Sequence, residues 1–97
     1  MPAARLVIRE RVVYEDGALV SMVVWRVPSP VTPSRHDLKY SLVYIVEGER
    51  VLGYDNERRK GDHGHFRGTE TPYKFTTIEK RLADFAAEVE MLRRKSV

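Results

Sequence analysis

The sequence of 97 residues predicts an α+β domain: a four-stranded, mostly antiparallel sheet built from two β-hairpins, followed by one long C-terminal helix packed on one face. Three observations support this fold class. Two pairs of segments are rich in β-branched and aromatic residues, each pair contains a short turn signal, and helical periodicity is confined to the C-terminal end. A chain of this length can bury one modest core, so we expect a single domain over residues 1–97.

The first predicted hairpin comprises Arg5–Tyr14 and Ala18–Val27, joined by Asp16-Gly17. This dipeptide is a strong signal for a two-residue turn. With such a turn, Tyr14 lies opposite Leu19 on the side that faces the core. The side away from the core, which could meet solvent, RNA or another protein, then carries three arginines: Arg9, Arg11 and Arg26.

The second predicted hairpin comprises Leu38–Glu47 and Arg50–Tyr54 around a Gly48-Glu49 turn. A stiff surface segment with three prolines between residues 28 and 37 separates it from the first hairpin. Both of its faces are apolar, whereas an antiparallel sheet that meets water usually has one polar face. Because one helix can cover only one face, we expect a homodimer or a bound partner to cover the other.

The C-terminal residues predict an amphipathic helix. Thr76 and Glu79 have the spacing of a capping box, so the helix should begin at Thr77 and run to Lys95. Its last turn is basic, as the negative end of the helix dipole favours. One apolar stripe should pack on the sheet, and it consists of Ile78, Leu82, Phe85, Val89 and Leu92.

Composition limits the class of function. The sequence has no cysteine, which excludes disulfides, thiolate zinc sites and cysteine nucleophiles. It has neither a signal peptide nor an apolar stretch long enough to span a membrane, so we expect a cytoplasmic protein without a membrane partner. The net charge of +3 and the pI near 9.4 favour an acidic partner such as RNA.

The segment Asp55–Gly68 concentrates polar, ionisable and glycine residues, and we expect it to form a functional loop at strand ends. If its His-Gly-His sequence is extended, both imidazoles project to one side about 7 Å apart, a separation that can bracket a phosphodiester. Histidine suits proton transfer near neutral pH because its reference pKa is about 6.5. The segment therefore favours RNA cleavage without a metal or other cofactor, and the candidate catalytic residues are His63, His65, Asp62 and Lys60.

Cationic and hydrogen-bonding side chains near the histidines could bind the phosphates or bases of an RNA substrate. The candidate substrate-binding residues are Arg58, Arg59, Arg67, Tyr73, Asp55 and Asn56.

Two alternatives remain open for the same segment. The two histidines with Asp55, Asp62 or Glu70 could bind a divalent metal and still support hydrolysis, and the ligands would then be His63, His65 and Asp55. Alternatively, the acidic, amide and glycine residues build turns while the histidines bond loop backbone. We favour the metal-free mechanism over the metal site because an H-x-H pair alone is a signal of low specificity.

Several motifs occur along the chain at characteristic spacing. They are Val24-Trp25-Arg26-Val27-Pro28, Lys39-Tyr40, Tyr54-Asp55-Asn56, Lys60-Gly61-Asp62-His63-x-His65, Glu70-x-Pro72-Tyr73-x-Phe75 and Asp84-Phe85. Together they resemble the TumE-like toxin family over nearly the whole chain, from Arg5 to Val89. Family members often have a basic residue between the two histidines, whereas this chain has Gly64, so we expect no phosphate contact from that position.

The resemblance implies the toxin of a bacterial toxin–antitoxin module, with a cognate antitoxin protein that often carries a helix-turn-helix domain. Combined with the chemistry of Asp55–Gly68, it predicts a growth inhibitor that cleaves or binds RNA. The alternative is a non-catalytic protein-binding module that inhibits or regulates a partner.

Overall fold

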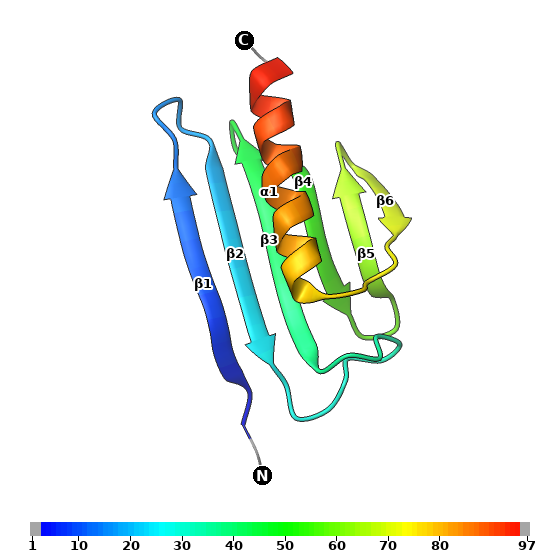
Figure 1. Cartoon of the computed structure of the whole chain (residues 1–97). Coiled ribbons are helices and arrows are strands. Elements are labelled where there is room, and N and C mark those ends of the chain that lie inside the picture. Colours follow the sequence, from blue (N-terminus) through cyan, green and yellow to red (C-terminus); the bar gives the residue numbers. More distant parts are fainter. Residues whose placement is uncertain (1–2, 96–97) are drawn as a thin grey trace.

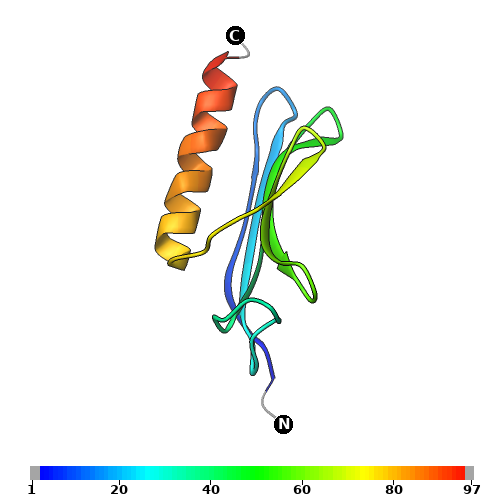
Figure 2. The ribbon, with the colours of Figure 1, turned by 90° about the vertical axis from the view of Figure 1, so that its right-hand side faces the viewer.

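The computed structural model, described here for residues 3–95, consists of a six-stranded antiparallel sheet and one helix that packs across one face of it (Figures 1 and 2). Neighbours in the sheet are neighbours in the sequence, so every connection joins two adjacent antiparallel strands. The elements are β1 (Arg5–Val13), β2 (Leu19–Arg26), β3 (Leu38–Val46), β4 (Glu49–Glu57), β5 (Gly61–Phe66), β6 (Thr69–Pro72) and α1 (Ile78–Lys95).

The predicted α+β class and the C-terminal helix on an antiparallel sheet are confirmed, but the prediction of four strands is wrong. The segment Asp55–Gly68 is not a loop, because it contains the end of β4 and all of β5, and β6 follows it. The strand β5 consists of glycine, histidine, aspartate and one phenylalanine, residue types with little or no β-propensity apart from the last. Backbone pairing with β4 and β6, rather than residue type, makes this segment a strand.

Two of the hairpins have tight two-residue turns. Glu47-Gly48 joins β3 to β4, one residue before the predicted turn, and Arg67-Gly68 joins β5 to β6. The four residues have φ angles of 52°, 79°, 48° and 86°, as a type I′ turn requires. Glycine at the second position adopts this conformation without a steric penalty from a Cβ atom.

The first hairpin has a three-residue turn instead of the predicted two-residue turn. The amide of Tyr14 donates to the carbonyl of Ala18 at 2.9 Å, and Gly17 has a φ of 86°. The register therefore differs from the prediction by one residue, and such a slip exchanges the two faces of a strand. The residues of β2 that face α1 are Val20, Met22 and Val24, rather than Leu19 and its alternate neighbours.

The hydrophobic core lies between α1 and the strands β2, β3 and β4. Each large apolar side chain that is fully buried there contributes about 1.5–3 kcal/mol. The predicted helical stripe is confirmed, with Phe85 and Val89 buried and the other three positions partly buried. The core residues are Ala18, Val20, Val24, Leu38, Tyr40, Leu42, Tyr44, Leu52, Phe85 and Val89.

The helix α1 begins at Ile78, one residue later than predicted. The hydroxyl of Thr77 accepts a hydrogen bond from the backbone amide of Lys80 at 3.1 Å, so Thr77 is the N-cap. The predicted capping box of Thr76 and Glu79 does not form, because the capping residue is the second of the two adjacent threonines.

A buried arginine joins α1 to β4. Only 1% of Arg81 is exposed, and its guanidinium carbon lies 3.4 Å from the ring centre of Tyr54 and 4.3 Å from that of Tyr73. Arg81 and the Tyr54 hydroxyl both donate to Glu88, at 2.9 Å and 2.7 Å. Burial, together with the hydrogen bond to Glu88, raises the pKa of Tyr54 to about 12. This cluster stabilises the contact between the helix and the part of the sheet formed by β4 and β5.

We predict that the free energy of unfolding falls as the pH rises from about 10 to about 12, and that Tyr54→Phe removes part of this fall. The pKa of Tyr54 is 10.0 without the fold and about 12 within it. The preference of the folded state for the neutral phenol is therefore complete below pH 10 and is lost as the pH passes through the folded pKa. Urea unfolding of both proteins at about pH 9 and about pH 11.5 measures the difference. Identical pH dependence in the two proteins would contradict the prediction.

We also predict that Gly64→Ala lowers the free energy of unfolding by about 1–3 kcal/mol, because it overpacks a filled space. A Cβ atom at position 64 would lie 2.8 Å from Cε1 of the Tyr54 ring, whose position is fixed by Arg81 and Glu88. Gly53→Ala is the matched control, because its nearest neighbour is the flexible, exposed side chain of Arg50. Equal destabilisation in urea by the two variants would contradict the prediction.

Candidate functional site

The helix covers one face of the sheet, and we call the opposite face the open face. Alternate residues of a strand point to opposite faces. Because Tyr54 packs against α1, its neighbours Gly53 and Asp55 lie on the open face of β4. Their paired residues on β5, His65 and His63, lie on the same face.

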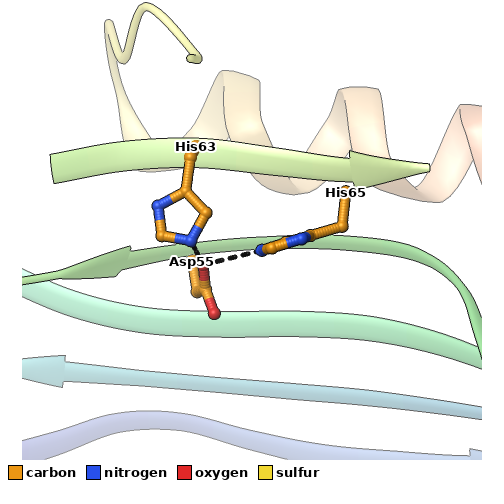
Figure 3. Close-up of side chains that lie close together, drawn as sticks. All are labelled: Asp55, His63 and His65. Atoms are coloured by element: carbon orange, nitrogen blue, oxygen red, sulfur yellow. Dashed lines mark ion pairs between the residues drawn. The ribbon is translucent and has the colours of Figure 1, made fainter. Parts of the chain in front are cut away.

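Asp55, His63 and His65 converge on the open face from two adjacent strands (Figure 3). The Nε2 atom of His63 lies 2.6 Å from Oδ1 of Asp55, and Nε2 of His65 lies 3.7 Å from the same oxygen. The two histidine side chains are only 3% and 11% exposed. Their ring centres are 4.8 Å apart, closer than the 7 Å predicted for an ideal strand, because both rings turn toward one carboxylate.

Glu70 of β6 lies at the solvent edge of this cluster. Its Oε1 is 3.9 Å from Nε2 of His63, and its Oε2 is 4.0 Å from Nδ1 of His65. Lys60 donates a hydrogen bond to Oε2 at 3.4 Å. Desolvation acts to raise the pKa of Glu70, but the hydrogen bond and charge of Lys60 outweigh it and lower that pKa overall. Glu70 is therefore a carboxylate at neutral pH.

Three atoms of the cluster are buried without a hydrogen-bond partner among the residues that the structure describes: Asp55 Oδ1, His63 Nε2 and His65 Nε2. The 2.6 Å contact between His63 and Asp55 has the length of a hydrogen bond but not its direction. The three atoms lie within 4.8 Å of one another. These residues could therefore share a proton or hold a metal ion.

Arg50 lies beside the cluster, and no pattern in the sequence pointed to it. The space that a Cβ atom of Gly53 would occupy is 2.9 Å from Cδ and 3.5 Å from Nε of Arg50. Gly53 is paired with His65, so the Arg50 side chain lies next to that imidazole on the open face. A β-bulge near Ile45 sets this position, and such an irregularity is not visible in residue type.

The structure does not bring Asp62, a predicted catalytic residue, to the histidines. As a neighbour of His63 in β5, it points to the other face. Its carboxylate accepts hydrogen bonds from Ser34 at 2.8 Å and from the Tyr40 hydroxyl at 2.7 Å, and lies 2.8 Å from Nε2 of His36. Burial and the hydrogen bond to Asp62 raise the pKa of Tyr40. This network connects the proline-rich segment to β5, which is a structural role.

The other predicted substrate-binding residues, apart from Asp55, lie away from the cluster. Asn56 is buried, and its amide accepts from and donates to the backbone of β3. Tyr73 packs on the helix side against the buried arginine. The exposed arginines lie in the two turns that flank β5, Arg58 and Arg59 in one turn and Arg67 in the other.

Basic residues continue across the open face toward β1. The observed register places Arg9 and Arg11 on this face together with Trp25, and the Arg9 guanidinium carbon lies 6.0 Å from the Trp25 ring centre. Lys39, paired with Trp25, follows on β3. Arg26 lies on the other face and forms an ion pair with Asp37 at 2.6 Å, so the three arginines do not share one surface as predicted.

Comparison with known proteins gives one match. The model of a protein family described as Toxin TumE matches residues 2–93, nearly the whole chain. The comparisons with curated proteins and with solved structures give no match. Within residues 3–95, no helix has the length and apolar character that crossing a membrane requires.

Proposed function

The chain belongs to the TumE toxin family, the toxin side of a toxin–antitoxin module, and we propose that it inhibits growth by cleaving RNA at the cluster of Asp55, His63 and His65. The convergence of these three buried side chains on the open face carries the proposal. Adjacent hydrogen-bonded strands hold them, which gives the precise and rigid geometry that a catalytic centre requires.

The chemistry of the cluster suits a phosphodiester. Cleavage requires a group that activates the attacking oxygen and a group that stabilises or protonates the leaving oxygen, and imidazole and carboxylate groups can do both. Arg50 and Lys60 lie beside the cluster and offset the negative charge that develops on the phosphorus centre. Both are exposed, so they can reach a substrate that lies on the sheet.

The rest of the open face supports RNA as the substrate. A sheet surface with aromatic and basic side chains binds single-stranded RNA by stacking on bases and by contact with phosphates. Here Trp25 offers an aromatic ring, and Arg9, Arg11 and Lys39 offer positive charge. The bound RNA strand would then run from β1 across the sheet to the cluster on β4 and β5.

The toxin family implies an antitoxin partner, and we propose that the antitoxin covers the open face. This face carries the half-buried apolar residues Val43 and Ile45 as well as the catalytic cluster. One partner could therefore bury the apolar surface and block the substrate path together. A homodimer through the same face would block the cluster permanently, so an antitoxin, expected to carry a helix-turn-helix domain, fits this surface better.

We predict that His65→Ala and His63→Ala each abolish growth inhibition and lower RNA cleavage by about 10²–10⁴-fold, because each removes one functional group of the centre. Growth curves after induction and cleavage of total RNA by purified protein measure the two effects. Arg94→Ala is the control, since Arg94 is exposed on α1 and pairs only with Glu90 among its recorded ion pairs. Growth arrest by both folded histidine variants at full strength would show that toxicity comes from binding without catalysis.

We further predict that Arg9→Ala and Arg11→Ala weaken RNA binding and each reduce the slope of log affinity against log salt by roughly one, because each removes one phosphate contact. Fluorescence anisotropy with a single-stranded RNA at several salt concentrations measures both quantities. Arg94→Ala is the control, because it changes the net charge by the same amount while Arg94 lies on α1 rather than on the open face. The same loss of affinity in Arg94→Ala would mean that net charge, not the open face, determines binding.

A further inference from the structure

We infer that Asp55, His63 and His65 form a binding site for one divalent transition-metal ion, with Oδ1 of Asp55 and the Nε2 atoms of both histidines as ligands. For its role in catalysis the inference rests on the proposed function, whereas metal binding itself can be tested separately. It assigns the histidines as ligands rather than as an acid–base pair.

The contact between His63 and Gly61 determines which nitrogen of the ring has a free lone pair. Nδ1 of His63 lies 2.9 Å from the carbonyl oxygen of Gly61, and a carbonyl only accepts hydrogen bonds, so Nδ1 carries the hydrogen. In the neutral ring, Nε2 then has the lone pair and faces the Asp55 carboxylate oxygen at 2.6 Å. Two electron pairs at this distance repel each other unless a positive species lies between them.

A proton on His63 does not account for the whole arrangement. The contact to Asp55 lacks the direction of a hydrogen bond. Nε2 of His65 points to the same oxygen from 3.7 Å and has no hydrogen-bond partner in the described part of the chain either. A proton can satisfy only one such pair. One cation among the three atoms satisfies all of them at once, and the buried His63 cannot turn its nitrogen to water instead.

The donor set points to the kind of metal. Imidazole nitrogens favour zinc, copper, iron or nickel over magnesium and calcium, and the Asp55 carboxylate is a ligand that also suits manganese. A histidine that donates its other nitrogen to a backbone carbonyl, as His63 does, is the usual arrangement around such ions. Bound at about 2.0–2.2 Å, two ligands of one ion lie roughly 3.0–3.5 Å apart, so the 2.6 Å contact has to widen by about 0.4–0.9 Å.

Three protein ligands leave positions open on the ion. Glu70 is near enough to supply a fourth, since its carboxylate lies 3.9 Å from Nε2 of His63 and is bonded only to the exposed Lys60 among its recorded hydrogen bonds. Otherwise water or a phosphate oxygen of the substrate fills them. An ion at this place would bind the phosphate and activate water, which are the two tasks that hydrolysis of RNA requires.

Isothermal titration of the full chain with zinc chloride and manganese chloride, after treatment with a chelator, tests the site. We expect one ion per chain, a rise in the melting temperature on binding, and at least a 100-fold loss of affinity in Asp55→Asn, an isosteric change that leaves the fold intact. His65→Ala should lose affinity similarly. His36→Ala is the control, because His36 belongs to the Asp62 network on the other face. Absence of binding, or an equal loss in His36→Ala, would overturn the inference.

RNA cleavage measured on the same samples separates this inference from the proposed function. Cleavage that stops in EDTA and returns with manganese or zinc supports both. Metal binding lost in Asp55→Asn, without RNA cleavage by the wild type, keeps the metal site and rejects the ribonuclease. Undiminished cleavage in EDTA keeps the ribonuclease and rejects the metal site.

Discussion

The antiparallel pairing of β4 with β5 is the constraint on which both the core and the candidate site depend. Paired residues share a face, so Tyr54 and Gly64 meet α1 while Asp55 and His63 meet on the open face. A slip of β5 by one residue would turn both histidines toward the helix while Asp55 stayed on the open face, so the cluster would not form. Burial of Tyr54 against Arg81 and α1 fixes the register, and therefore the side chains that stabilise the fold also determine the geometry of the site.

The sheet separates two polar clusters that are alike in composition and different in bonding. On the helix side, Asp62 accepts hydrogen bonds from neighbouring side chains that fix it firmly in place. On the open face, buried atoms of Asp55 and both histidines lack hydrogen-bond partners within residues 3–95, at a cost of about 1–3 kcal/mol for each such group. Arg81 Nε on the helix side is unsatisfied too, but only on the open face do several such atoms converge on one point, which makes that cluster the candidate for function.

The sequence predicted the features that depend on periodicity and could not predict those that depend on register. The helical stripe and the convergence of His63 and His65 on one side follow from spacing alone. Asp62 was expected beside them because a loop allows any direction, whereas in the strand it alternates with His63 and points away. The face of β2 was assigned wrongly because the turn includes Glu15 as an additional residue, which reverses the face. The number of residues in a turn cannot be read from residue types alone.

Two glycines explain how one small patch of sheet carries large groups on both of its faces. Gly64 leaves the space on the helix side that the Tyr54 ring fills, and Gly53 leaves the space on the open face over which Arg50 lies. Gly53 is also the residue opposite His65, so no side chain stands between that imidazole and the arginine. A substituent at Gly64 would push the Tyr54 ring away from its place under the helix, and one at Gly53 would displace the Arg50 side chain. Glycine is one of the residue types that made Asp55–Gly68 resemble a loop in the sequence. In the fold, the glycines of β4 and β5 let a helix contact and a candidate catalytic centre share the same two strands.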